Sequence, residues 1–157
     1  YEVKNFGVSA RTMMNKGDLP YMNELAWRDA QAFNPDIVIV KLGTNDSKTH
    51  NWAHGADEYR QSMQAMIDTL KALPSKPKIY LCSPIPAFKD SWTISDSIIV
   101  NGEMPIIKKL SKKNKCQFID LHTSYTYGDM MLKDGIHPNA KGAEKMANII
   151  FEAIEKK

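Results

Sequence analysis

Hydrophobic residues cluster along the chain in four short apolar runs that turn-forming residues bring to an end. These runs occupy residues 1–6, 36–42, 78–82 and 116–121. The second and third runs are rich in β-branched residues and nearly unbroken, which is typical of parallel strands covered on both faces. We therefore predict four β-strands at these positions.

Between the runs, apolar residues recur at spacings of three and four, as they do on one face of a helix. The clearest helical segments are residues 57–73 and 140–154. A further segment, 96–113, contains Pro105, which should kink or restart the helix, and a weaker helix is predicted over 22–33. Strands that alternate with helices predict right-handed β-α-β units, a parallel sheet and a three-layer α/β/α sandwich.

The composition is that of one globular domain. The chain has 157 residues, of which 43% are hydrophobic and 25% charged, so a disordered or fibrous chain is excluded. Its net charge of +3 is too small to indicate a nucleic-acid partner, and no apolar stretch approaches the ~20 residues of a membrane span. Cys82 and Cys116 lie at opposite ends of neighbouring predicted strands, so we expect two free thiols.

Polar residues follow the predicted strands at their carboxyl ends, where open parallel sheets bind ligands. Gly7 follows the first run, Asn45 follows the second, and the loop after the fourth contains Asp134 and His137. The Asp134 carboxylate can accept a hydrogen bond from the His137 imidazole, which leaves the other ring nitrogen free as a base. The Asn45 amide is a neutral donor that suits an oxyanion.

Each of these motifs taken alone also has a purely structural explanation. Asp134 and His137 fit a loop that caps the last helix, while Gly7 and Asn45 fit turn positions.

The histidines near residue 50 suggest a second kind of site. His50 and His54 have the spacing of a metal-binding pair on a helix, but no third ligand of the right kind adjoins them, so no metal is expected. Trp52, between them, suits either stacking on a carbohydrate or packing over the end of the sheet.

Three motifs in a fixed order are far more specific than any one of them. They are Asn5-x-Gly7-x-Ser9, Gly43-Thr-Asn-Asp46 and Asp134-Gly-Ile-His-Pro-Asn139. Together they resemble the SGNH hydrolases, also called the GDSL lipase/esterase family, over nearly the whole chain. The sequence of residues 5–12 and 43–48 is especially similar to that of bacterial acetylesterases that act on sialate or xylan.

This resemblance implies a flavodoxin-like SGNH hydrolase fold and a serine ester hydrolase that removes O-acetyl groups from carbohydrate. It implies that His137 is the general base, that Asp134 orients it, and that the backbone N–H of Gly7 and the side chain of Asn45 hold the oxyanion. The implied partner is an acetylated carbohydrate or another small ester, and no metal or organic cofactor is needed.

The family's Gly-Asp-Ser nucleophile motif does not occur in these 157 residues. In the family, its strand lies centrally in the sheet, between the first two strands predicted here. We therefore expect residues 1–157 to be a single SGNH hydrolase domain, truncated at its N-terminus, whose open strand edges invite self-association. The compartment is left open, although secretion or a periplasmic location would suit the full-length enzyme.

The sequence also contains other serines near strand ends, and it allows functions other than ester hydrolysis. Ser9, Ser47 and Ser83 lie near strand ends, but turn formation or capping explains each better than a nucleophilic role. A non-catalytic carbohydrate-binding or interaction domain on the same fold is favoured by the missing serine and disfavoured by the retained Asp, His and Asn. A flavodoxin-like binding domain is disfavoured because the chain has no glycine-rich phosphate-binding loop.

Overall fold

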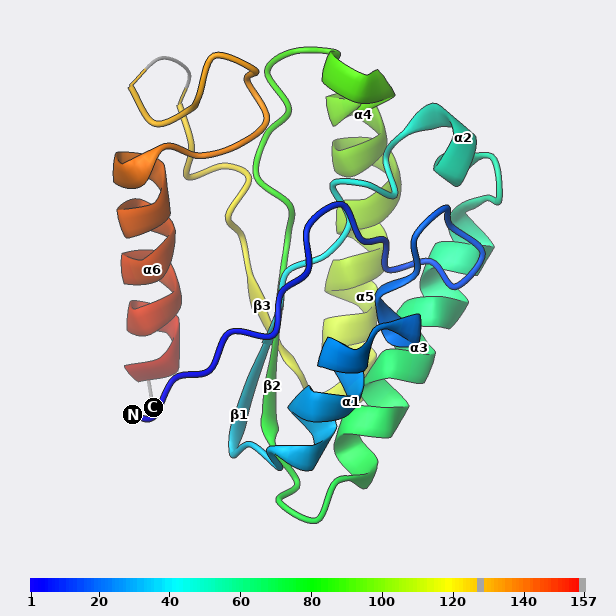
Figure 1. Cartoon of the computed structure of the whole chain (residues 1–157), viewed down its shortest axis with the longest axis vertical. Helices are drawn as coiled ribbons and strands as arrows, with labels where there is room; N and C mark the ends of the chain where they lie inside the picture. The colour runs from blue at the N-terminus through cyan, green and yellow to red at the C-terminus, as the bar shows by residue number, and fades with distance from the viewer. Residues whose placement is uncertain (127–128, 156–157) are drawn as a thin grey trace.

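The fold is built around a parallel sheet. A computed structural model describes residues 1–126 and 129–155. Within these residues three strands, β1 (Ile37–Val40), β2 (Lys78–Cys82) and β3 (Gln117–Ile119), pair in the order β1-β2-β3. All pairs are parallel, so the carboxyl ends of the strands meet at one edge of the sheet (Figure 1).

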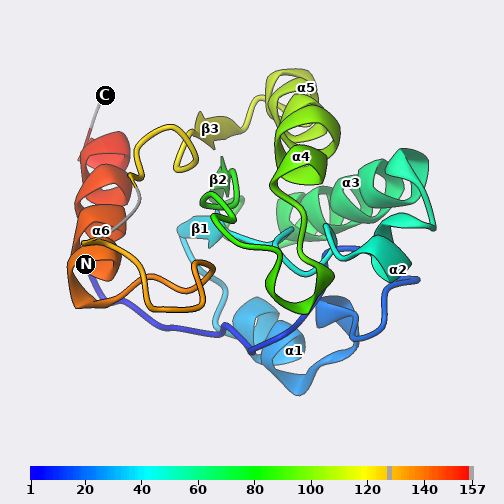
Figure 2. The same ribbon diagram turned by 90° about the horizontal axis from the view of Figure 1, so that it is seen from above.

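Helices cover both faces of this sheet. They are α1 (Leu25–Ala32), α2 (Thr49–Trp52), α3 (Ala56–Ala72), α4 (Asp96–Ile98), α5 (Met104–Asn114) and α6 (Ala140–Glu155), with 3-10 turns at Tyr21–Asn23 and Ser91–Thr93. Figure 2 shows α3 and α5 on one side of the sheet and α6 on the other. The predicted α/β class and three-layer arrangement are confirmed.

The central strand β2 is apolar on both faces because each face supports its own core. Ile79 and Leu81 are buried in the core shared with α3 and α5. The alternate residues Tyr80 and Cys82 are buried in the core shared with β3 and α6. Successive side chains of a strand point to opposite faces, so burial on both sides requires the unbroken apolar run that the sequence shows.

The helix predicted over 96–113 is divided into three parts. After α4, a π-helical segment occupies Ile99–Glu103, and α5 then begins with Pro105 in its first turn. Proline has no N–H to donate, and the first turn of a helix does not need one. Pro105 therefore restarts the helix.

The strand predicted over residues 1–6 does not form. The segment crosses in front of the sheet in Figure 1, but it pairs with none of the described strands. A groove of about 720 Å³ is lined by residues 1–8, by β1 and by Ile150, Phe151 and Ile154 of α6. We call it the β1 groove. An apolar run becomes a strand only beside a partner, and here nothing described lies close enough to pair with it.

Two further expectations concern cysteines and membrane spans. Cys82 and Cys116 are both free thiols, as predicted, and burial raises the pKa of Cys82 to about 12. None of the described helices combines the length and the apolar character needed to cross a membrane.

Candidate active site

A cleft of about 410 Å³ lies at the carboxyl edge of the sheet. Its walls come from the segment 8–11, the loop 41–48 after β1, and residues 136–138 before α6. Both Asn45 and His137 line it, although they are 92 positions apart in the chain. The fold therefore brings two of the predicted site residues together where parallel sheets bind ligands.

The imidazole of His137 is oriented by Asp134. The Asp134 Oδ2 atom lies 3.1 Å from Nδ1 of His137, and its Oδ1 atom accepts the backbone N–H groups of His137 at 2.9 Å and Ile136 at 2.8 Å. These backbone hydrogen bonds, first that of His137 and then that of Ile136, lower the pKa of Asp134, so the carboxylate stays ionised. With Nδ1 held in this way, Nε2 is free to act as a base.

Capping of the last helix belongs to a different residue. Asn139 Oδ1 accepts the N–H of Gly142 at 3.1 Å, in the first turn of α6. Asp134 closes its own tight turn and contacts the imidazole, so the capping explanation considered for Asp134 does not describe its contacts.

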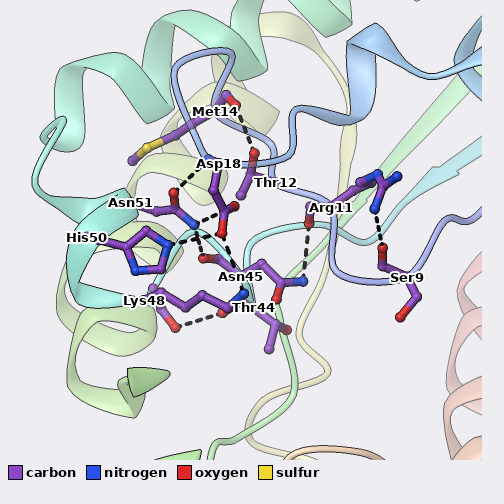
Figure 3. A network of polar contacts seen from close by, with 11 residues as sticks. Ser9, Arg11, Thr12, Met14, Asp18, Thr44, Asn45, Lys48, His50 and Asn51 are labelled. Carbon is purple, nitrogen blue, oxygen red and sulfur yellow. Dashed lines mark hydrogen bonds and ion pairs between the residues drawn. The ribbon is translucent and has the colours of Figure 1, made fainter. Parts of the chain in front are cut away.

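Hydrogen bonds hold both the side chain and the backbone carbonyl of Asn45. Its Nδ2 donates to the carbonyl of Arg11 at 3.2 Å, and its carbonyl accepts from Nδ2 of Asn51 at 2.8 Å (Figure 3). A side-chain amide has two N–H donors, so one can hold the Arg11 carbonyl while the second serves the cleft. This arrangement suits an oxyanion donor because it needs no reorganisation when charge develops.

The carboxyl group of Asp46 joins the two loops behind Asn45. It is fully buried and accepts the backbone N–H groups of Met13 at 2.9 Å and Met14 at 2.7 Å. Burial raises the pKa of Asp46 to about 7, in opposition to these hydrogen bonds. The segment after residue 8 and the loop after β1 are thereby locked to each other.

His50 belongs to a polar network below the same loop (Figure 3). Asp18 Oδ2 lies 3.0 Å from His50 Nε2, while Asp18 Oδ1 accepts from Asn51 Nδ2 at 3.0 Å. The network ends on the Asn45 carbonyl, so it helps to fix the position of Asn45. Over the described ranges, no group of three or more His, Cys, Asp or Glu side chains is placed to hold a metal ion.

Three basic side chains line the cleft. They are Arg11, Lys41 and Lys48, and none of the described lining residues is acidic. Arg11 is paired with Glu24 at 2.6 Å and Lys48 with Asp18 at 3.8 Å, whereas burial lowers the pKa of Lys41. Positive groups around a cleft favour the negative charge that develops on a carbonyl oxygen during acyl transfer.

Gly7 does not face this cleft. It lines the adjoining β1 groove, and its N–H donates to Oδ1 of Asn5 at 2.8 Å. The expectation that its N–H shares a cleft with Asn45 and His137 is therefore not met by the described residues. Since none of the described segments fills the groove, the Asn5 side chain accepts this hydrogen bond.

Comparison with known proteins agrees with the motifs and with the fold. A profile of the GDSL-like lipase/acylhydrolase family matches residues 1–145. The chain belongs to this family.

Two curated proteins share extensive sequence with the chain. It is 53% identical to an acetylxylan esterase of Xylanibacter ruminicola over 99% of this chain and 36% of that protein. It is 30% identical to a multidomain esterase of Ruminococcus flavefaciens over 78% of this chain and 16% of that protein. The chain thus spans about a third or less of the length of these relatives.

Solved structures of the family have the same fold. The chain is similar to the acetyl xylan esterase AlAXEase with a TM-score of 0.67 and 25% identity, covering 85% of this chain and 74% of that one. It is similar to a GDSL-like lipase of Bacteroides thetaiotaomicron with a TM-score of 0.67 and 27% identity, covering 82% and 66%. The predicted SGNH hydrolase fold is confirmed.

Ser9, Ser47 and Ser83, the three serines near strand ends, differ in their surroundings. Ser47 Oγ donates to the Thr44 carbonyl at 2.8 Å, and Ser83 Oγ accepts from the N–H groups of Leu121 and His122 at 2.9 and 3.0 Å. Both serines are buried, and these bonds hold loops together. Of the three, only Ser9 lines the cleft.

The aromatic side chain at the cleft is one that the sequence analysis missed. Trp52 packs against the ring of Tyr59 and the backbone of Gly102, which supports the packing alternative for that residue. Trp92 lines the cleft instead, and its ring meets that of His137 edge to face, with centroids 5.7 Å apart. It lies in an irregular loop, where no periodicity signals its importance.

Proposed function

We propose that this chain carries the general base and an oxyanion donor of a serine-type acetylesterase that acts on O-acetylated carbohydrate. The observation that carries the proposal is that Asn45 and His137 line one cleft while Asp134 holds the far nitrogen of the imidazole. The relatives named as acetylxylan esterases support an acetylated xylan as the substrate, with O-acetylated sialate as the second candidate.

Each residue has a defined part in the proposed reaction. A serine hydroxyl attacks the acetyl carbonyl while Nε2 of His137 takes its proton, and the Asp134 carboxylate stabilises the imidazolium that forms. The amide of Asn45 holds the oxyanion, and the Gly7 N–H would join it only after giving up its hydrogen bond to Asn5. The imidazolium then returns the proton to the sugar oxygen as it leaves, and water hydrolyses the acetyl-enzyme by the same steps.

The nucleophile would come from a Gly-Asp-Ser segment outside these 157 residues that docks in the β1 groove as a parallel strand. Support comes from the unpaired edge of β1 and the apolar walls of the groove. The groove and the cleft also share Val8, Lys41 and Leu42 in their linings, so a strand in the groove would end beside His137. Docking would place polar groups of the new segment near the Gly7 N–H, which now donates to Asn5. Residues 1–157 and the docked segment would then form one domain.

The alternative is a non-catalytic carbohydrate-binding or interaction domain. The absence of Gly-Asp-Ser from the chain favours it. A binding domain would have no use for an imidazole whose Nδ1 is held by a carboxylate, and this geometry makes the esterase the better proposal.

Ester hydrolysis by the whole natural polypeptide that contains this chain tests the proposal. We expect hydrolysis of aryl acetates and acetylated xylan, with kcat lowered by about 10³-fold or more in His137→Ala. The matched control is His54→Ala, an exposed histidine away from the cleft. The 157 residues alone should give no more than a trace rate.

Two results would contradict this assignment. Saturable turnover that survives His137→Ala would remove the histidine from the mechanism. Binding of acetylated xylan by the whole polypeptide without any hydrolysis would favour the binding domain.

A further inference from the structure

The loop between β2 and α4 places Trp92 over the candidate catalytic histidine. The side chain is 59% exposed, yet it lines the cleft and contacts the ring of His137. An exposed tryptophan at the mouth of a polar cleft buries little apolar area in the folded chain. Its position therefore has to be explained by something other than packing.

The backbone at this tryptophan is strained. Trp92 has φ +54° and ψ +31°, and Thr93 has φ +61°. Bulky and β-branched residues rarely adopt the left-handed region, and two in succession are unusual. Such strain persists where the surrounding structure over-determines it, and it clusters at ligand clamps and active sites.

Hydrogen bonds hold the loop to the turn that carries His137. The N–H of Phe88 donates to the Gly135 carbonyl at 2.9 Å, and Oγ of Ser91 donates to the Asp134 carbonyl at 3.0 Å. These bonds flank Trp92 on its N-terminal side. The indole therefore has a fixed position relative to the imidazole.

The other side of the loop is held to the turn that carries Asn45. The N–H of Ser95 donates to Oγ of Ser47 at 3.2 Å, and this hydroxyl donates in turn to the Thr44 carbonyl. Asp96 closes the loop by accepting the N–H of Ala87 at 2.8 Å and by contacting His122 Nε2 at 3.0 Å. One rigid loop thus links the base and the oxyanion donor.

We infer that Trp92 is the platform on which the sugar ring bearing the ester stacks, an inference that rests on the proposed function. The face of an indole is electron-rich, so it attracts the slightly positive C–H groups on one face of a pyranose. The side chain stands beside the imidazole that would protonate the leaving sugar oxygen, so a ring stacked on it presents that oxygen to His137. Because most of the indole is exposed, it suits a leaving group that extends into solvent, as a polysaccharide does.

A binding measurement tests this inference independently of catalysis. The whole natural polypeptide carrying His137→Ala, which blocks turnover, is titrated with acetylated xylo-oligosaccharide. We expect Trp92→Ala to weaken binding by about 10-fold and Trp92→Tyr to retain most of the affinity, because stacking on an aromatic face contributes of the order of one factor of ten. His54→Ala serves as the background control.

A glycine at the same position separates stacking from structure. Trp92→Gly removes the indole but relieves the left-handed backbone, so we expect Tm to rise by about 2–4 °C while binding weakens as in Trp92→Ala. A purely structural tryptophan would instead lower Tm when it is removed.

Kinetics distinguish failure of this inference from failure of the proposed function. In the polypeptide with its histidine intact, Trp92→Ala should raise KM for acetylated xylo-oligosaccharide about 10-fold and should reduce hydrolysis of ethyl acetate, which carries no sugar ring, far less. Equal losses on both esters, or unchanged binding of the oligosaccharide by Trp92→Ala, would overturn the role of Trp92. If the unsubstituted polypeptide hydrolyses no ester at all, the esterase proposal fails. The binding measurement alone then decides whether Trp92 stacks on the sugar.

Discussion

Asp46 shows how one buried side chain shapes a site that it does not enter. Its two oxygens accept consecutive backbone N–H groups, those of Met13 and Met14, from a segment more than thirty positions earlier in the chain. The bonds hold the segment whose Arg11 carbonyl in turn accepts from Asn45. The orientation of Asn45, the proposed oxyanion donor, thus depends on a carboxyl group in the core.

The raised pKa of Asp46 predicts a pH dependence of stability. The folded protein holds this proton up to about pH 7, whereas the unfolded chain releases it near 3.8. The proton therefore stabilises the fold fully below pH 4, and that contribution is lost as the pH rises through 7. Relative to Asp46→Asn, the free energy of unfolding should fall by roughly 1–3 kcal/mol between pH 5 and 8, measured by urea denaturation.

The asparagine variant is itself the control for this prediction, since it cannot titrate and leaves Glu103, another buried carboxyl group, in place. Parallel pH profiles for the two proteins would show that Asp46 is ionised throughout the range.

Asn45 gives a prediction for catalysis at the scale of one residue. In the whole polypeptide, Asn45→Ala should lower kcat by about 10²–10³-fold with little change in KM, because an oxyanion donor acts mainly in the transition state. Asn101→Ala, an exposed asparagine on the π-helical segment, is the matched control. A change confined to KM would assign Asn45 to substrate binding alone.

At the scale of an element, the turn after β1 depends on close packing around Gly43. Its φ is +133°, and a Cβ there would lie 2.5 Å from Oε2 of Glu103 and 3.0 Å from the hydroxyl of Tyr59. Both of those side chains are completely buried, and burial raises the pKa of Glu103 well above its usual value. The π-helical segment ends at Glu103, so it packs directly beneath the Asn45 loop.

A pair of glycine variants tests this packing. Gly43→Ala should lower the free energy of unfolding by about 2–4 kcal/mol, since it combines backbone strain with overpacking. Gly55→Ala has a similar backbone cost, with φ +88°, but no heavy atom within 4 Å of the added methyl group, so about 1 kcal/mol is expected. Equal losses in thermal or urea unfolding would mean that strain alone matters at Gly43.

Helices and strands could be predicted from the sequence where the hydrophobic pattern of a segment matches a packing or pairing partner in the fold. The three strands and the long helices α3 and α6 follow from periodicity, because each lies against the core that its pattern requires. Residues 1–6 have a strand pattern but no pairing partner, and the π-helical segment has no distinct period. The contact between Asp134 and His137 could be predicted because it is local, whereas the position of Trp92 depends on contacts with two distant loops.

At the scale of the molecule, the outer side of strand β1 faces the β1 groove and pairs with none of the described strands. Ile39 of β1 is 42% exposed in this groove, which is unusual for a β-branched residue in a parallel sheet. Free N–H and C=O groups beside apolar walls favour pairing with another chain. We therefore expect the 157-residue chain to self-associate through this strand.

Sedimentation velocity over a range of concentrations tests this prediction. The chain should form dimers or larger species, and Ile39→Lys should shift it to monomer, because a charge on an exposed strand edge blocks pairing. Leu25→Lys, on an exposed residue outside the groove, is the matched control and should not change the distribution. A monomer at all concentrations would contradict the prediction.

The hydroxyl of Tyr1 donates to Oε1 of Glu155 at 2.6 Å, so the first and last described residues are neighbours in space (Figure 1). Chains whose ends meet in this way tolerate circular permutation, since a short linker can close them while the chain is opened at an exposed turn. The strand proposed for the β1 groove is therefore expected to reach it from either end of the chain through linkers of similar length. Circular permutants that attach it at one end or at the other should keep the same order of strands in the sheet.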